Sequence, residues 1–137
     1  GLGFMENSSL CLDTDVLIRY LKGRDPVASA VEKAVKNYAS CVTAITAYEL
    51  LFGVARAKRE IGEQELLGIM KILPLNHASA RRAAQLHSDL ISRNKDIGIK
   101  DVLIAAICLE HKIPIFTANE KHFVRVDGLT VFNFMQI

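Results

Sequence analysis

The stretch LCLDTDVLI, residues 10–18, decides the fold of this chain. Its first three residues are apolar and suit a buried β-strand, and Asp13 ends that run before a second apolar pattern begins at Val16. In α/β folds, ligands and catalytic groups gather at the carboxyl ends of the strands. An acidic residue at such a strand end therefore indicates a functional edge, and other acids are expected to converge on it.

The chain has 137 residues, of which 50% are hydrophobic and 23% are charged. This length and composition predict one compact globular domain, which we place at residues 5–137. Gly1–Phe4 precede Met5 and are expected to be an expression remnant. The formal net charge of +2 does not by itself indicate a nucleic-acid-binding protein.

The cellular compartment is predicted from the apolar segments and the cysteines. The longest apolar stretch, Val102–Leu109, is far too short to cross a bilayer, and no signal peptide is visible. Cys11, Cys41 and Cys108 lie in apolar surroundings without metal-ligand spacing. We therefore expect them to be buried packing residues of a cytoplasmic protein that has no membrane partner.

Short β-rich runs alternate with helical patterns along the chain. Strands are expected over residues 10–12, 39–43, 72–75, 113–117 and 129–132. Helices are expected over residues 16–22, 27–37, 47–58, 63–71, 78–93 and 101–111. This alternation predicts an α/β fold, in which helices cover both faces of a parallel sheet. Helix 101–111 is apolar nearly all round and is expected to be buried. Helix 47–58 has one apolar face, made of Ala47, Leu50, Leu51, Val54 and Ala55.

Three acids far apart in the sequence are expected at one edge of the sheet. Asp13 ends the first strand, Glu49 lies in the first turn of the helix after Thr43, and Asp101 opens the buried helix. Helices of a parallel α/β fold begin where the strands end, so all three acids point to the same edge. Asn119, which follows the strand ending at Thr117, belongs there too.

Each acid also has a plainer explanation. Thr46 and Glu49 have the spacing of a capping box, and Asp13 and Asp101 would each serve as an N-cap, an interaction worth about 1 kcal/mol. Taken together, however, three neighbouring carboxylates repel one another unless a cation neutralises them.

A divalent cation would give these acids a chemical role. Mg²⁺ prefers carboxylate oxygens, water and phosphate, and Mn²⁺ is the alternative ion. Such an ion activates water and neutralises charge at a phosphodiester, so no protein nucleophile is needed. The sequence offers none, because the cysteines are expected to be buried and no serine lies in a nucleophile elbow. The four histidines lack the spacing of a zinc site.

Four motifs occur in order along the chain. They are LDTDVLI (residues 12–18), AITAYELLFG (44–53), GIKDVLIAA (98–106) and FTANEKHF (116–123), the last followed by Gly128 and Leu129. This series resembles the PIN-domain ribonucleases, specifically the VapC-type toxins of toxin–antitoxin pairs. The resemblance runs from Cys11 to Phe134, and four ordered motifs are a far stronger signal than one.

The resemblance implies a three-layer α/β/α sandwich around a parallel sheet of about five strands. It implies that Asp13 and Asp101 are metal ligands and that Glu49 is a third acid, which coordinates the metal or orients its water. It also implies an RNA substrate, a homodimer, and a protein antitoxin that threads a segment across the acidic pocket.

The fourth motif departs from the family pattern. Many relatives carry an acid at the position of Asn119 or of His122, and this chain has neither. Three acids instead of four favour a site for one ion, to which Asn119 can still contribute as a ligand or through water. His122 is left outside the predicted site. Thr14 and Thr117 flank the edge and either orient a carboxylate or phosphate or make ordinary turn hydrogen bonds.

Several alternatives stay open on the sequence. Gly53, one turn beyond Glu49, either leaves room for substrate or allows close helix packing. The basic side chains at 19, 22 and 24 and at 56, 58 and 59 are solvated helix faces or phosphate contacts. A catalytically weak module that binds RNA or protein is the second candidate function. Asp13-Thr14-Asp15 also resembles the nucleophile motif of haloacid-dehalogenase-type phosphatases, but no later acidic pair supports this.

Overall fold

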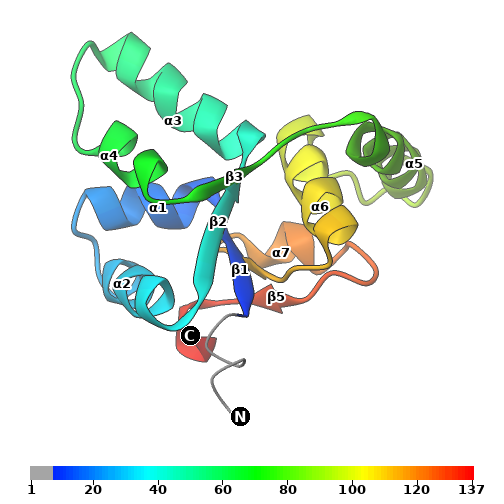
Figure 1. Ribbon diagram of the computed structural model, residues 1–137. Helices are drawn as coiled ribbons and strands as arrows, with labels where there is room; N and C mark the ends of the chain where they lie inside the picture. The colour runs from blue at the N-terminus through cyan, green and yellow to red at the C-terminus, as the bar shows by residue number, and fades with distance from the viewer. Residues whose placement is uncertain (1–7) are drawn as a thin grey trace.

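The computed structural model describes residues 8–137. The expectations for Gly1–Phe4 and for a domain that begins at Met5 lie outside the described residues. Within residues 8–137 the chain forms a five-stranded parallel sheet with the strand order β3-β2-β1-β4-β5 (Figure 1). The strands are β1 (Ser9–Leu12), β2 (Ala39–Thr43), β3 (Lys71–Leu73), β4 (Ile115–Phe116) and β5 (Val131–Phe132).

Helices cover both faces of this sheet. They are α1 (Thr14–Leu21), α2 (Val27–Asn37), α3 (Ala44–Ala57), α4 (Glu63–Gly68), α5 (His77–Ser92), α6 (Ile99–His111), α7 (Glu120–Phe123) and the 3-10 helix η2 (Phe134–Gln136). In Figure 1, α1, α2 and α4 lie on one side of the sheet, and α5, α6 and α7 lie on the other. Each side has its own buried apolar cluster. The three-layer α/β/α sandwich with a parallel sheet of five strands is therefore confirmed.

The strand order reverses at β1, which lies in the middle of the sheet. Cys11 of β1 lies opposite Cys41 of β2 on one side, and Leu12 lies opposite Phe116 of β4 on the other. In open α/β sheets, the crevice for ligands forms at such a reversal, beyond the carboxyl ends of the strands. Asp13 and Thr117 are the first residues past the ends of β1 and β4, so both lie at this crevice.

Four helices, α1, α3, α5 and α6, begin one to three residues earlier than the apolar periodicity predicted. Helix α3 begins at Ala44 instead of Ala47, because the Thr43 side chain caps it by accepting a hydrogen bond from the Thr46 backbone N–H at 3.2 Å. Helix α6 begins at Ile99 after the positive-φ residue Gly98. Helices α7 and η2 were not predicted, since elements of four and three residues show no periodicity.

Helices α6 and α3 differ in burial. The buried position predicted for α6 is confirmed, as Val102, Ile104 and Ile107 are at most 1% exposed. The apolar face predicted for α3 is only half right: Ala47 and Leu50 are buried, but Leu51 is 43% exposed. Figure 1 shows that the second half of α3 extends away from the sheet, toward α4.

The cysteines are buried and unpaired, as predicted. Hydrogen bonding to Cys108, together with burial, raises the pKa of the Cys11 thiol, which suits a packing group and not a nucleophile. Among the described residues, every helix falls short of the length and apolarity that a bilayer crossing needs.

Candidate active site

Asp13 lies at the centre of the candidate site. It is the N-cap of α1 and only 4% exposed, and its Oδ1 accepts a hydrogen bond from the Thr14 backbone N–H at 2.8 Å. Its Oδ2 accepts a hydrogen bond from the Thr117 hydroxyl at 2.7 Å. Burial raises the pKa of Asp13, and the negative charges of Asp15 and Asp101 raise it further, whereas the bond from Thr117 lowers it. Positive charge is therefore favoured at this point of the molecule.

Glu49 lies in the second turn of α3, not in the first turn as predicted, because the helix begins at Ala44. The predicted capping box is wrong for the same reason: Thr43 caps the helix, and the Glu49 carboxylate is not needed there. Its Oε1 instead accepts a hydrogen bond from the Thr14 hydroxyl at 2.8 Å. Its Oε2 lies 3.1 Å from the Lys100 ammonium group.

The Thr14 hydroxyl joins two elements at the site. It lies 2.8 Å from Glu49 Oε1 and 2.9 Å from the Thr46 hydroxyl oxygen. A hydroxyl has one proton and the carboxylate can only accept, so Thr14 donates to Glu49 and accepts from Thr46. Ordinary turn hydrogen bonding therefore does not describe Thr14, because its side chain orients an acid on another helix.

Asp101 is the third residue of α6, and the predicted N-cap role is wrong because Gly98 occupies that position. Its Oδ2 lies 2.7 Å from His122 Nδ1 and 3.4 Å from Asn119 Nδ2. The carboxylate can only accept, so the shorter contact requires the proton on His122 Nδ1. The Asn119 backbone N–H donates to the Thr117 hydroxyl oxygen at 2.9 Å, which joins Asp101 to the Asp13 end of the site.

One chain of polar contacts therefore links the six predicted site residues. It runs from Glu49 through Thr14 to Asp13, and then through Thr117 and Asn119 to Asp101. The acids do not share one cation-sized point, however. Within residues 8–137, no three His, Cys, Asp or Glu side chains are grouped closely enough to hold a metal ion between them. Their carboxylates are engaged by separate protein donors instead.

The acids still suit a hard cation in two respects. All three present carboxylate oxygens near one edge of the sheet, and oxygen is the ligand atom that Mg²⁺ and Mn²⁺ prefer. The mutual influence of Asp13 and Asp101, seen in the raised pKa of Asp13, is the electrostatic situation that a bound cation relieves.

Sequence reasoning missed four polar residues at the site: Asp15, Thr46, Lys100 and His122. The Asp15 carboxylate accepts a hydrogen bond from the Ala118 backbone N–H at 3.3 Å, across the gap between α1 and the end of β4. His122 follows Asn119 by three residues, which places both on one turn. That spacing was the available signal for His122, whereas no sequence signal pairs Lys100 with Glu49.

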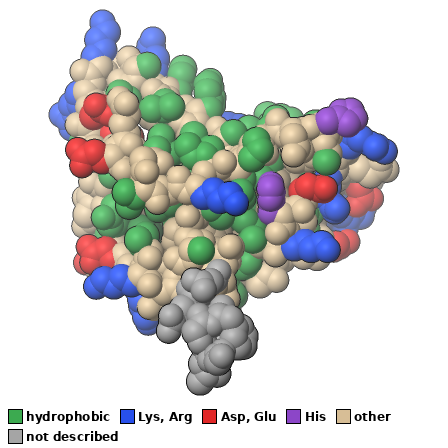
Figure 2. Space-filling view, in the orientation of Figure 1, with side chains coloured by type: hydrophobic (Ala, Val, Ile, Leu, Met, Phe, Trp, Pro, Cys, Tyr) green, Lys and Arg blue, Asp and Glu red, His purple; other side chains and the backbone are tan. Residues whose placement is uncertain are grey.

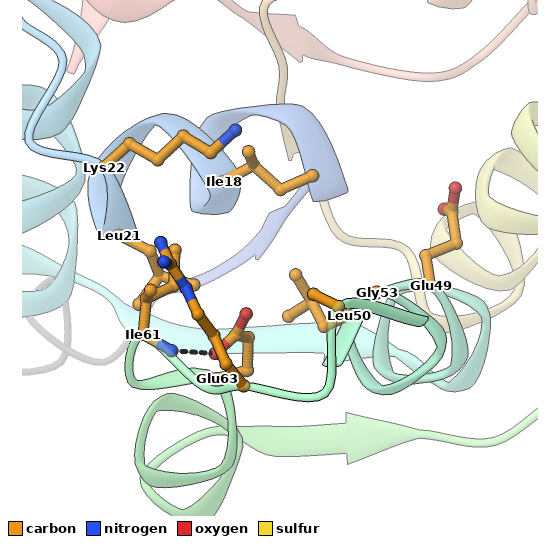
Figure 3. Close-up of a pocket in the computed structure, with 10 residues that line it drawn as sticks. Ile18, Leu21, Lys22, Glu49, Leu50, Gly53, Ile61 and Glu63 are labelled. Carbon is orange, nitrogen blue, oxygen red and sulfur yellow. Dashed lines mark hydrogen bonds between the residues drawn. The ribbon is translucent and has the colours of Figure 1, made fainter. Parts of the chain in front are cut away.

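A groove of about 440 Å³ opens beside Glu49 (Figure 3). Its walls come from α1 and α3 and from the segment after α3, and they include Ile18, Leu21, Lys22, Leu50, Gly53, Ala57, Arg59, Ile61 and Glu63. Figure 3 shows Glu49 at one end of this groove. A Cβ added to Gly53 would meet no atom within 4 Å, so close helix packing is not the reason for this glycine. The residue leaves the groove open.

Comparison with known proteins identifies the family. The PIN domain model matches residues 10–129. The chain belongs to the PIN domain family. A relative named Ribonuclease VapC, from Rickettsia bellii (strain RML369-C), is 30% identical, and the alignment covers 89% of this chain and 93% of the relative.

Two solved structures resemble this PIN domain closely. FitAcB from Neisseria gonorrhoeae has a TM-score of 0.80 at 27% identity, with 93% of this chain and 99% of that chain covered. VapBC-5 from Mycobacterium tuberculosis, described as a member of the VapBC family of toxin-antitoxin systems, has a TM-score of 0.68 at 25% identity. That alignment covers 92% of this chain and 97% of the other. The phosphatase resemblance is therefore not the family to which the chain belongs.

In this PIN domain, the fourth motif contributes Asn119 and His122 where an acid is common in relatives. Both side chains contact the same oxygen of Asp101. Asn119 and His122 thus give Asp101 hydrogen-bond donors, where an acid would give it a further negative charge. At these two positions the chain has no carboxylate, although Asp15 of the first motif is a further acid that raises the pKa of Asp13.

Proposed function

We propose that this PIN domain is a metal-dependent endoribonuclease and the toxin of a toxin–antitoxin pair. One observation carries the proposal: the buried Asp13 carboxylate lies at a strand end where Asp15 and Asp101 oppose its ionisation. Keeping Asp13 ionised in such a place needs a nearby positive charge. The names of the relatives, a ribonuclease and a toxin-antitoxin complex, support the reaction class and the biological role.

Asp13, Asp101 and Glu49 would hold the cation, Mg²⁺ or Mn²⁺. When bound, the ion would activate water and neutralise charge that develops on the scissile phosphodiester. The remaining work belongs to the chain itself. Thr117 and the start of α1 hold the Asp13 carboxylate at a set angle, and Thr14 does the same for Glu49. Asn119 and His122 orient Asp101.

The groove beside Glu49 is the proposed path for RNA. Lys22 and Arg59 line it and can contact phosphates, while its apolar walls exclude water. Further basic side chains at the C-terminal ends of α1 and α3 extend the positive surface. Binding is therefore expected to weaken as salt rises.

The proposed protein partners are an antitoxin and a second copy of this chain. The groove is open and largely apolar, with Glu49 and Glu63 in its walls, so it suits an extended antitoxin segment that carries a basic side chain. The second copy would use α3, where Tyr48 and Phe52 stack at 5.7 Å and are more than half exposed. Figure 2 shows hydrophobic side chains gathered over this part of the molecule. We place the complex in the cytoplasm.

Cleavage of RNA by purified variants tests the proposed reaction. Asp13→Asn should abolish Mg²⁺- or Mn²⁺-dependent cleavage of a labelled single-stranded RNA, because it removes a charge that the cation needs. Asp127→Asn is the matched control, since this exposed acid lies away from the site, and it should cleave like the wild type. Undiminished cleavage by Asp13→Asn would contradict the proposal.

A binding module without turnover is the second candidate, and one observation favours it. Lys100 and His122 already engage two of the three acids. If the protein binds Mn²⁺ and RNA but cleaves no member of a total RNA pool, this second function replaces the first.

A further inference from the structure

Lys100 is a basic side chain at the site to which the resemblance assigns no role. It is the second residue of α6 and precedes Asp101. Its ammonium group lies 3.1 Å from Glu49 Oε2, and its side chain is 61% exposed. A lysine ammonium group is positively charged at neutral pH, and this one is in direct contact with Glu49.

Helix stability does not explain a lysine at this position. The first turn of a helix carries partial positive charge, so Asp and Glu are favoured there and Lys is unfavourable. An ion pair as exposed as Lys100–Glu49 also contributes little to folding stability. Solvent screens the two charges, and fixing two long side chains in one geometry costs entropy. A role in binding explains the position better.

The geometry suits a phosphate ligand. An ammonium group has three N–H donors, and the contact with Glu49 uses one of them. The remaining N–H donors of this exposed side chain face solvent at the edge of the acidic site. An RNA phosphate that approaches there is repelled by the carboxylates, and a positive charge offsets this repulsion. A lysine binds phosphate as a compact point charge and needs no fixed geometry.

We propose that Lys100 is a phosphate-binding residue of this site, held in place by Glu49 until RNA binds, and that it then exchanges the Glu49 carboxylate for an RNA phosphate. The exchange frees Glu49 Oε2, for which Lys100 and a divalent cation compete. The inference rests on the proposed nuclease function. It requires that loss of the Lys100 charge weakens RNA binding and strengthens cation binding.

The first measurement is RNA affinity. Fluorescence anisotropy of a labelled single-stranded RNA, in EDTA so that the RNA stays intact, is recorded with the full chain at several salt concentrations. Lys100→Met should weaken binding roughly fivefold and lower the slope of log affinity against log salt by about 0.7, as expected for one lost phosphate contact. Lys100→Arg keeps the charge and should behave like the wild type.

The second measurement is Mn²⁺ affinity without RNA, followed by the electron paramagnetic resonance signal of free Mn²⁺. Lys100→Met should bind Mn²⁺ about 30-fold more tightly, which is the effect of removing a unit charge about 4 Å from a divalent ion in a water-like dielectric. Lys112→Met is the matched control at the far end of the same helix, about 18 Å away by helix rise. At that distance salt screens the charge, so this control should change neither affinity.

The Asp13→Asn variant distinguishes a failure of the proposed role of Lys100 from a failure of the proposed nuclease function. If Asp13→Asn loses both Mn²⁺ binding and RNA cleavage but Lys100→Met leaves either affinity unchanged, the role of Lys100 is wrong and the proposed function stands. If Asp13→Asn binds Mn²⁺ like the wild type, the proposed function fails and the role of Lys100 fails with it. Opposite shifts of the two affinities in Lys100→Met, absent in Lys112→Met, support the proposal.

Discussion

Helices α3 and α6 each deliver one acid to the same strand edge, yet they are held very differently. Helix α6 is packed into the core over most of its length, with Ile104, Ala105 and Ala106 at most 1% exposed. Helix α3 is buried mainly in its first half, and beyond Leu50 it projects past the sheet with Leu51 and Phe52 exposed. Asp101 is thus fixed by the core, whereas Glu49 lies at the rim of an open groove.

This contrast separates two uses of apolar side chains. On α6 they hold the fold together and determine where Asp101 lies. On α3 they leave a hydrophobic surface beside the groove, where a partner can cover it. A site between one rigid and one partner-accessible helix can be blocked by an antitoxin without any change to the core.

The largest effect is expected when the two acids are exchanged for amides one at a time. Asp101→Asn should lower the rate of RNA cleavage about 100- to 1,000-fold, since it removes a preorganised charge at the cation. Glu49→Gln should lower it about 10- to 100-fold, as is typical of a group that orients a ligand or water. Single-turnover cleavage rates measure both. Equal losses would show that the two helices hold their acids alike.

Core packing gives the next largest effect. Ile104→Ala on α6 removes a side chain that is 1% exposed and should lower the free energy of unfolding by about 2–4 kcal/mol. Leu51→Ala on α3 removes one that is 43% exposed and should change it by less than about 0.5 kcal/mol. Urea denaturation measures this difference. A cost for Leu51→Ala that depends on protein concentration would instead place α3 in a dimer interface.

The smallest effect concerns Asp13, whose ionisation is opposed by Asp101 of α6 and by Asp15. Its pKa is raised in the folded protein, first by burial, so the folded state binds a proton more tightly than the unfolded chain. The contribution of Asp13 to stability is therefore greatest below the ordinary pKa of 3.8, and it falls as the pH rises through the raised pKa. In EDTA at pH 7, Asp13→Asn should unfold at a higher urea concentration than the wild type. The difference between the two urea midpoints should shrink as the pH is lowered toward 4. A less stable Asn variant at pH 7 would contradict this sign.

Much of the fold could be predicted because the signals are local. The LCL run before Asp13 predicted a buried strand, and continuous apolar character predicted the burial of α6. Predictions failed where a tertiary neighbour decides the outcome. Periodicity predicted one apolar face on α3, but Leu51 on that face is 43% exposed. The capping box at Thr46 failed because Thr43, already at a strand end, was the better cap.

The sequence by itself determined that the acids lie at strand ends and helix starts, because strand and helix periods are properties of short segments. Only the tertiary structure decided which partner each carboxylate oxygen takes. Thr117 reaches Asp13 across 104 residues of chain, Thr14 reaches Glu49 across 35, and His122 reaches Asp101 across 21. Such pairings depend on how strands β1 and β4 and helices α3 and α6 pack, and no local pattern encodes that packing.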